Sequence, residues 1–334
     1  MIPDFLPALS RALGTAIPGL DRLENTMRLS GGASQETWSF DAIANGLSEP
    51  LILRRSPGGA PRGQGTGVNS VPLATEATVI EAARKTGVAA PRVRYVLAPD
   101  DEVGEGYVMD RLAGETLARR ILRDEAFAGA RPKLAYQCGE ILARIHSVDT
   151  TSLASMLQAM DGAAQLKRYR DIYDAYDYPH PMFEFAFKWL EPRLAKSARR
   201  TLVHGDFRHG NLLISPNGVE AALDWELVHI GDPLEDIGWI CTNSWRFGAA
   251  HKVVGGFGDL ADLLAGYEAA GGAHIDPEDV RNWIVYGSLK WGIMCMTMYQ
   301  AFLHSDHSVE RAAIGRRSSE TEIDLVNLIL HGAM

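Results

Sequence analysis

A chain of 334 residues is longer than most single domains and favours two domains or one large two-lobed unit. With 46% hydrophobic and 22% charged residues, the composition excludes a largely disordered chain. The formal net charge of −9 argues against a nucleic-acid-binding protein that depends on overall basicity. The widely spaced Cys138, Cys241 and Cys295 include no CxxC pair, which predicts reduced thiols in a cytoplasmic protein.

The first third of the chain is rich in predicted strands. Four short runs of apolar or alternating residues predict strands, at residues 37–40, 51–55, 92–97 and 106–109. The first two runs flank a turn signal at Asn45 and Gly46, which predicts a hairpin. Helical periodicity begins near Ala74, and Gly87 is a plausible helix end. The region therefore predicts the order β, β, α, β, β, with one helix interrupting an antiparallel sheet.

Helical periodicity dominates after residue 112. Helices are predicted at residues 133–146, 163–176 and 183–195 and again, as long helices, between residues 234 and 330. Three short apolar runs, at residues 201–203, 212–214 and 221–223, interrupt this pattern. Residues 283–303 are long enough to span a bilayer, but Lys290 in their middle favours a buried core helix. We therefore expect no membrane span, a first domain of residues 1–110 and a second of residues 111–334.

One segment, residues 202–239, carries the residues of a chemical site. It contains His204-Gly205-Asp206, then Asn211 before one predicted strand and Asp224 after the next. The two ends of a hairpin lie side by side, so Asn211 and Asp224 are predicted to converge as oxygen ligands suited to Mg²⁺. Asp206 lies on the loop just before them, where a carboxylate can accept a proton from a hydroxyl. Together these groups predict a phosphoryl-transfer enzyme.

The same segment resembles the catalytic core of the aminoglycoside phosphotransferase family, which shares the protein-kinase-like fold. HGDFRHGN resembles the family's catalytic loop, ALDWE its metal-binding segment and GDPLEDIGW the motif that follows. The resemblance extends over essentially the whole chain. It implies an α+β, two-lobed fold with a small antiparallel sheet and one main helix in the first lobe and a larger, mostly helical second lobe. The implied activity is transfer of the γ-phosphoryl group of ATP or GTP to a hydroxyl of a small molecule, with Mg²⁺.

The resemblance also assigns roles to single residues of the catalytic segment. Asp206 is implied to be the catalytic base, and Arg208 resembles the basic residue that kinases place near the γ-phosphate. Asn211 and Asp224 are implied to hold Mg²⁺. His204, Asp232 and Asp236 are better explained as structural groups, the two carboxylates as helix caps or supports of the catalytic loop.

The nucleotide-binding residues are implied to lie in the first lobe. Glu76 resembles the glutamate that pairs with the nucleotide-binding lysine of kinases, but Arg54 stands at the position of that lysine, and Arg55 is an alternative. The other nucleotide-binding residues implied are a phosphate-covering loop and a hinge that pairs with adenine: Ser30, Gly31, Gly32, Ala33 and Ser34 for the loop, and Met109, Asp110 and Leu112 for the hinge.

The acceptor and the rival functions stay open at this stage. The sequence is similar to the phosphotransferase domains fused to some acyl-CoA dehydrogenases, which implies a hydroxyacyl-CoA-like acceptor ahead of an aminoglycoside. Arg311, Arg316 and Arg317 would suit an anionic acceptor, or they form a solvated helix face that pairs with Glu320 and Glu322. The alternative is a catalytically silent, nucleotide-binding regulatory protein, for which Arg54 is the sequence argument. We expect a monomer or weak homodimer.

Overall fold

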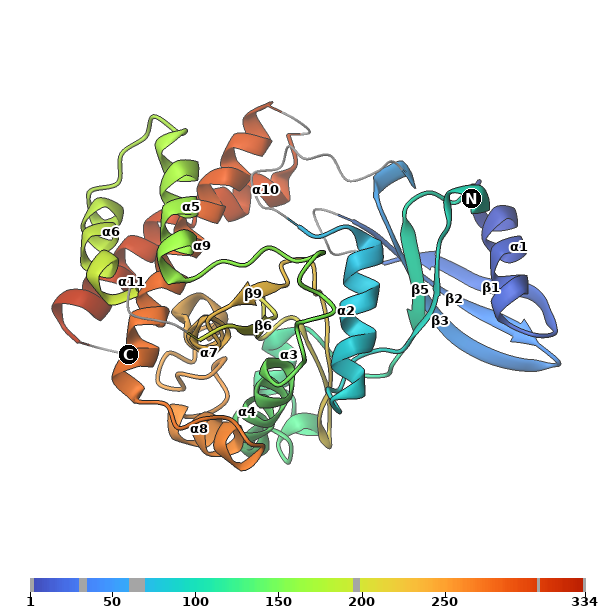
Figure 1. Cartoon of the computed structure of the whole chain (residues 1–334), viewed down its shortest axis with the longest axis horizontal. Coiled ribbons are helices and arrows are strands. Elements are labelled where there is room, and N and C mark those ends of the chain that lie inside the picture. The colour runs from blue at the N-terminus through green and yellow to red at the C-terminus, as the bar shows by residue number, and fades with distance from the viewer. Residues whose placement is uncertain (1–2, 30–34, 60–69, 195–198, 305–306, 333–334) are drawn as a thin grey trace. The chain divides into compact units, whose positions relative to one another are not determined.

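The computed structural model describes residues 3–29, 35–59, 70–194, 199–304 and 307–332. It divides into two compact units (Figure 1). The first comprises residues 1–114 together with residues 220–227, and the second comprises residues 115–219 and 228–334. The first division falls a few residues after the expected one, and the short later segment joins the first unit, which the sequence did not suggest. Among the described residues, no helix is long and apolar enough to cross a membrane.

The first unit is built on a five-stranded antiparallel sheet. Its order is β1-β2-β3-β5-β4. The strands are β1 (Leu20–Arg28), β2 (Glu36–Ala44), β3 (Leu47–Arg55), β4 (Val93–Val96) and β5 (Gly106–Asp110). Two helices accompany the sheet: α1 (Leu6–Ala16) contacts β1, and α2 (Leu73–Lys85) contacts β4 and β5. Short 3₁₀ turns lie at Pro57–Gly59 and Pro99–Asp101.

Local sequence signals explain most of this unit. Asn45 and Gly46 both have positive φ, which gives the hairpin turn that matches the twist of β2 and β3. Gly87, with φ of 83°, follows the last residues of α2, as its sequence position predicts. Apolar side chains of α1 pack against those of the sheet to form the core, with Leu9, Leu13, Phe40, Leu51 and Val108 among its buried members.

The first strand of the sheet is the element that the sequence analysis missed. β1 pairs with β2 alone, so it is an edge strand, and most of its side chains are half-buried or exposed. Its pairing shifts register between Leu20 and Arg22 and again between Glu24 and Met27. Such irregularities destroy the alternation by which a strand is recognised in a sequence. The expected order β, β, α, β, β is therefore corrected to one with an additional leading strand.

The second unit is mostly helical. Its helices are α3 (Ala118–Arg123), α4 (Arg131–His146), α5 (Gly162–Asp174), α6 (Pro181–Leu194), α7 (Leu234–Cys241), α8 (Leu260–Ala269), α9 (Pro277–His304), α10 (Val309–Gly315) and α11 (Ser318–Leu330). The long helix α9 contacts α5, α6, α7, α10 and α11 (Figure 1), and most of its first half is buried. The expectation of a buried core helix around Lys290 is thus confirmed.

Helices α4 and α8 lie in close contact, and two glycines make the approach possible. A Cβ atom on Gly139 would lie 2.0 Å from the carbonyl oxygen of Leu263, and one on Gly266 would lie 2.0 Å from that of Tyr136. Because backbone atoms cannot yield as a flexible side chain can, any larger residue would force the helices apart.

Short strands in the middle of the chain carry the candidate site. Strand β6 (Thr201–Val203) pairs antiparallel with β9 (His229–Gly231), and β7 (Leu212–Ser215) pairs with β8 (Gly218–Ala222). The chain passes from the second unit to the first within β8. The loop between β6 and β7 holds Asp206, Arg208 and Asn211 in the second unit, whereas Asp224 follows β8 in the first.

Candidate active site

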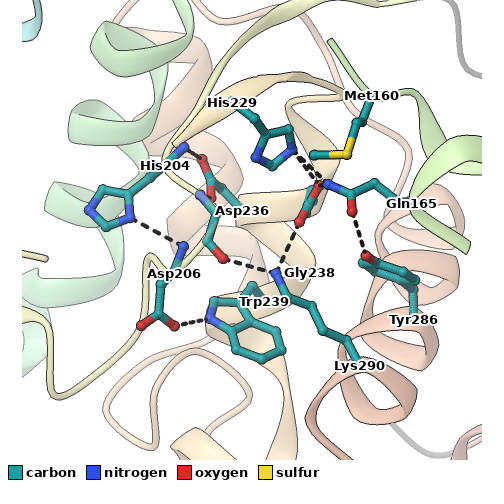
Figure 2. Close-up of polar contacts among 12 residues, drawn as sticks. Met160, Gln165, His204, Asp206, His229, Asp236, Gly238, Trp239, Tyr286 and Lys290 are labelled. Carbon is teal, nitrogen blue, oxygen red and sulfur yellow. Dashed lines mark hydrogen bonds and ion pairs between the residues drawn. The ribbon is translucent and has the colours of Figure 1, made fainter. Parts of the chain in front are cut away.

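Asp206 is held in one orientation by three neighbouring side chains. Its side chain is largely buried, and one oxygen, Oδ1, accepts hydrogen bonds from the Trp239 indole (2.7 Å; Figure 2) and from Arg208 Nε (3.0 Å). The other oxygen, Oδ2, accepts one from the Asn211 amide (2.7 Å). Hydrogen bonds to an ionised carboxylate are shorter and stronger than neutral ones. The carboxylate of Asp206 is therefore already held in one orientation as a hydrogen-bond acceptor.

Asp236 fixes the backbone that leads into Asp206. It is fully buried on α7, and its two oxygens accept the backbone N–H groups of His204 (2.8 Å) and Gly205 (2.9 Å; Figure 2). The ring nitrogen Nε2 of His146 lies 3.2 Å from the same carboxylate. Burial raises the pKa of Asp236, but the hydrogen bond and charge of His146, with those of His204, outweigh burial and leave the pKa below its usual value. Asp236 thus supports the loop that carries Asp206, as expected for a structural carboxylate.

His204 and Asp232 also have structural contacts. The backbone N–H of Asp206 donates to His204 Nδ1 (3.2 Å), which tightens the turn before Asp206. Asp232 accepts the backbone N–H of Leu234 (2.8 Å) at the start of α7, the contact of a helix-capping side chain. Burial raises the pKa of Asp232 to about 6, even though this hydrogen bond acts in the opposite direction.

Asn211 presents an oxygen suited to a metal ion. Its amide nitrogen donates to the backbone carbonyl of Asp206 (3.0 Å) as well as to the Asp206 carboxylate, so both amide hydrogens are used. The amide oxygen is then the atom with which Asn211 can bind a cation. Amide and carboxylate oxygens are the ligands that Mg²⁺ prefers, so Asn211 and Asp224 each carry an oxygen of the kind that the predicted metal would bind. Asn211 belongs to the second unit and Asp224 to the first, and their joint site stays a prediction.

Arg54 is the centre of a polar cluster in the first unit. On β3, its guanidinium lies 2.7 Å from Asp224 Oδ1 and 3.5 Å from Glu76 Oε1, and its Nε donates to Gln35 (2.9 Å). Glu76, fully buried on α2, also accepts a hydrogen bond from Tyr107 (3.0 Å). Burial lowers the pKa of Arg54, but Glu76 and its other neighbours raise it well above the usual value. The expected ion pair between Arg54 and Glu76 is present.

Arg55 has different neighbours. It pairs with Glu36 (2.8 Å), donates to the carbonyl of Val103 (3.0 Å) and lies 3.9 Å from the ring centroid of Phe5. Successive side chains of a strand point to opposite faces, so Arg54 and Arg55 cannot share a partner set. Of the two candidates, Arg54 is the one that contacts Glu76, and its role in nucleotide binding stays a prediction.

Asp224 has an unusual backbone conformation. Its φ is 66°, in the left-handed region that few residues other than glycine adopt. Strained residues of this kind persist where surrounding contacts fix them, often at functional sites. Here Arg54 holds the side chain, and Glu226, two residues later, accepts the N–H of Val71 (2.9 Å) through its backbone carbonyl and is 3.2 Å from Gln35 through its side chain.

The remaining predicted nucleotide contacts are only partly described. Met109 and Asp110 end β5, where Asp110 pairs with Arg94 (3.0 Å), and Leu112 is exposed just beyond the strand. Their contact with adenine stays a prediction. The predicted phosphate-covering loop lies outside the described residues, with Ser30, Gly31, Gly32, Ala33 and Ser34.

Sequence reasoning missed two residues next to Asp206. Trp239 donates to Asp206, and Lys290, on α9, donates to the carbonyl of Gly205 (2.9 Å; Figure 2). Trp239 ends the GDPLEDIGW motif, which is the one signal that could have drawn attention to it. Lys290 was noted only as a polar interruption of an apolar helix. Its distance in sequence from Gly205 hides the contact.

Known proteins share this fold. The model of the phosphotransferase enzyme family matches residues 26–281, and the chain belongs to this family. The structure of a candidate aminoglycoside phosphotransferase from Ralstonia eutropha JMP134 superposes with a TM-score of 0.73 at 20% identity, covering 96% of this chain and 97% of that one. A thermostable mutant of the aminoglycoside phosphotransferase APH(4)-Ia, solved with AMP-PNP and hygromycin B, superposes with a TM-score of 0.63 at 15% identity, covering 96% and 98%. The fold is thus the kinase-like fold of aminoglycoside phosphotransferases, as the sequence predicts.

A curated relative matches part of the chain. Mouse acyl-CoA dehydrogenase family member 10 is 30% identical over 220 residues, which are 63% of this chain and 20% of that protein. The matched region therefore spans about a fifth of the length of the mouse protein.

Proposed function

We propose that this chain transfers the γ-phosphoryl group of ATP or GTP to a hydroxyl of a small molecule in the cytoplasm, with Asp206 as the base. The observation that carries the proposal is the fixed carboxylate of Asp206, which Trp239, Arg208 and Asn211 orient. Phosphoryl transfer needs little covalent chemistry from a protein and depends on positioning and charge stabilisation. Asp206 would orient the acceptor hydroxyl and accept its proton as the oxygen attacks the γ-phosphorus, while the nucleoside diphosphate leaves.

Arg208, the cation beside Asp206, is proposed to bind the transferring phosphoryl group as well as to orient Asp206. Arg208 Nε contacts Asp206, and the guanidinium lies 4.6 Å from the ring centroid of Trp245, so the ring and the carboxylate fix its plane. A guanidinium held this way can bind an oxygen of the transferring phosphoryl group and stabilise its negative charge.

The first unit is proposed to bind the nucleotide. The cluster of Arg54, Glu76 and Gln35 holds a permanent cation in one place on β3, and a guanidinium is suited to bidentate phosphate contacts. Residues 30–34 would cover the phosphates, and Met109, Asp110 and Leu112 would contact the base.

Asn211 and Asp224 are proposed to hold Mg²⁺. The ion, when bound, would neutralise phosphate charge. In this chain, Arg54 lies 2.7 Å from one oxygen of Asp224, so the guanidinium and the metal would share this carboxylate. Replacement of Asp224 by alanine should therefore abolish the Mg²⁺ dependence of nucleotide binding. ATP affinity unchanged by this variant in the presence of Mg²⁺ would contradict the assignment.

The acceptor is proposed to be an anionic hydroxy compound of the hydroxyacyl-CoA type. The relative named an acyl-CoA dehydrogenase family member suggests such chemistry. In the second unit, Arg317 lies 5.7 Å from the ring centroid of Trp291, whose ring packs on Trp245 at 4.7 Å. Together with Arg208, these residues form a row of cations and aromatic rings that suits an anion. Arg317 also pairs with Glu320 (3.0 Å), as the simpler explanation of this patch predicts.

An aminoglycoside is the second candidate acceptor, because the APH(4)-Ia structure contains hygromycin B. Both candidates can be tested in one experiment. The protein is incubated with Mg²⁺ and ATP or GTP and with a panel of hydroxyacyl-CoA compounds, aminoglycosides and a metabolite extract, and phosphorylated products are detected by mass. Asp206→Asn is the matched variant, because it keeps the shape of the side chain. Full activity of this variant would refute the base assignment.

The same assay separates the enzyme from the silent regulatory protein. Nucleotide binding by calorimetry without any transfer would favour the regulatory protein, whereas transfer that depends on Asp206 excludes it. Sedimentation of the active protein tests the expected monomer or weak homodimer.

A further inference from the structure

A buried polar cluster lies behind the catalytic loop in the second unit. Lys290 on α9 is 3% exposed, and its ammonium donates to the carbonyl of Gly205 (2.9 Å) and to Glu235 Oε1 (3.1 Å). It also lies 4.4 Å from the ring centroid of Trp239. Figure 2 shows Lys290 reaching from its helix towards Trp239, the indole that donates to Asp206.

The other side of the cluster compensates the buried charge. Glu235 Oε2 lies 3.0 Å from His229 Nε2 and accepts a hydrogen bond from the Gln165 amide (3.0 Å). The Gln165 oxygen in turn accepts one from Tyr286 (3.2 Å; Figure 2). Burial raises the pKa of Glu235, but Lys290 and His229 lower it to about 2. Burial lowers the pKa of Lys290, but the charge of Glu235 outweighs this effect and leaves the pKa above its usual value.

Stability alone is a poor explanation for such a pair. A buried ion pair gains little over apolar side chains of the same volume, because removing two charges from water is costly. Lys290 is distinguished by the two groups that its ammonium contacts. One is the carbonyl of Gly205, the residue before Asp206, and the other is the ring of Trp239, which binds the Asp206 carboxylate. The same ammonium therefore contacts two neighbours of the proposed base.

We propose that Lys290 is a positioning residue for the phosphoryl-transfer base: its ammonium fixes the Gly205 carbonyl and the Trp239 ring, and thereby the orientation of the Asp206 carboxylate. The chemistry rests on the proposed function, but the positioning is a property of the fold. Glu235, held by His229 and Gln165, serves to keep the ammonium charged and in place.

The test uses variants of the full chain that separate positioning from stability. Lys290→Met alone leaves Glu235 buried without its main partner, and such a change destabilises a fold. The double variant Lys290→Met with Glu235→Gln removes both charges and should unfold at a higher temperature than Lys290→Met. Val285→Ala, a buried truncation on the same helix, is the matched control for destabilisation without loss of a polar contact.

Two readouts decide the outcome. The first is the Trp239 indole N–H resonance, assigned with Trp239→Phe, and its exchange with solvent. In the double variant we expect the resonance to move towards its position in Asp206→Ala and its exchange to accelerate, whereas in Val285→Ala it should stay in place. The second is steady-state kinetics with the acceptor found above. We expect kcat to fall about 10- to 100-fold in the double variant, with the nucleotide KM within about twofold of the unmodified chain.

Each alternative result overturns the proposal. A double variant whose indole resonance coincides with that of the unmodified chain shows that Lys290 does not act on Trp239. A double variant whose kcat equals that of the unmodified chain shows that the pair is merely structural. If the unmodified chain phosphorylates no acceptor, the proposed function fails, and the indole resonance alone decides whether Lys290 positions Asp206.

Discussion

Replacing Asp236 by asparagine perturbs the loop that carries Asp206 with almost no change in the shape of the side chain. The carboxylate accepts two backbone N–H groups, from His204 and Gly205, and lies against a nitrogen of His146. The two N–H groups bind different oxygens of the carboxylate, and in asparagine one of these oxygens is replaced by an NH₂ group, so only one N–H group keeps its acceptor. The other N–H group would face the NH₂ group and lose its acceptor in a site that water does not reach.

The expected loss in the free energy of unfolding follows from the number and kind of hydrogen bonds that the variant loses. A buried donor without an acceptor costs about 1–3 kcal/mol, and each hydrogen bond to a charged group contributes about 1.5–3 kcal/mol. Asp236→Asn should therefore lower the free energy of unfolding by about 3–5 kcal/mol, which corresponds to a fall of roughly 10 °C in Tm for a unit of this size. Because the pKa of Asp236 is lowered below 3.8, neutral pH is the condition in which the full effect appears.

The assay combines thermal unfolding by circular dichroism at neutral pH with phosphoryl-transfer kinetics. The matched control is Asp171→Asn, the same chemical change at an exposed position of α5, where Asp171 pairs with Lys167. The control should leave Tm and kcat essentially unchanged, because exposed ion pairs contribute little. Asp236→Asn should also lower kcat about 10- to 100-fold, because Asp236 holds His204 and Gly205, the two residues directly before Asp206. Equal Tm values for the two variants would refute the argument that Asp236 holds the loop.

Three further predictions concern packing, nucleotide binding and pH. Gly139→Ala should lower the free energy of unfolding by about 3 kcal/mol or more in urea titrations, because its Cβ would meet the backbone of α8, whereas Gly129→Ala, with open space around it, should not. Arg54→Lys should weaken Mg-ATP binding about tenfold by calorimetry, since lysine keeps the charge but cannot span the same partners, and Arg22→Lys on the exposed edge strand should have no effect. The folded-state pKa of Asp232 is raised from 3.8 to about 6, so its contribution to stability is complete below pH 3.8 and is lost as the pH rises through 6. Asp232→Asn should remove this loss, which is on the order of 3 kcal/mol; a pH slope identical to that of the unmodified chain in urea midpoints would contradict it.

Local signals predicted the fold well wherever they are regular. The Asn45-Gly46 turn and the Gly87 helix end were recognised because particular backbone angles demand those residues. The edge strand β1 was missed because its register shifts remove the alternation of buried and exposed side chains. Helix α9 was recognised by its length and apolar content, although its central lysine is a buried contact and not merely a tolerated exception.

Some residues of the candidate site could be predicted from the sequence, and others could not. Asp206, Asn211 and Asp224 could be proposed from spacing and from the family resemblance, because they lie close together in the sequence. Trp239 and Lys290 could not, since a tryptophan in an apolar helix and a lysine in a long one have many ordinary explanations. Their relation to Asp206 exists only after α7 and α9 have packed. The choice between Arg54 and Arg55 likewise required the side of β3 on which each lies.

The segment of residues 220–227 gives the first unit an unusual order of assembly. The unit is not contiguous: the N–H of Ala222 binds the carbonyl of Ala89 (2.8 Å), and Asp224 binds Arg54. As the chain leaves the ribosome, the first 114 residues emerge without these partners, and they must wait for about another hundred residues before the sheet unit is complete. Cutting the chain after residue 114 would therefore yield a fragment that lacks a segment of its own unit and leaves the buried guanidinium of Arg54 without Asp224. The nucleotide-binding half proposed here can become whole only after the entire loop that carries Asp206 has been synthesised.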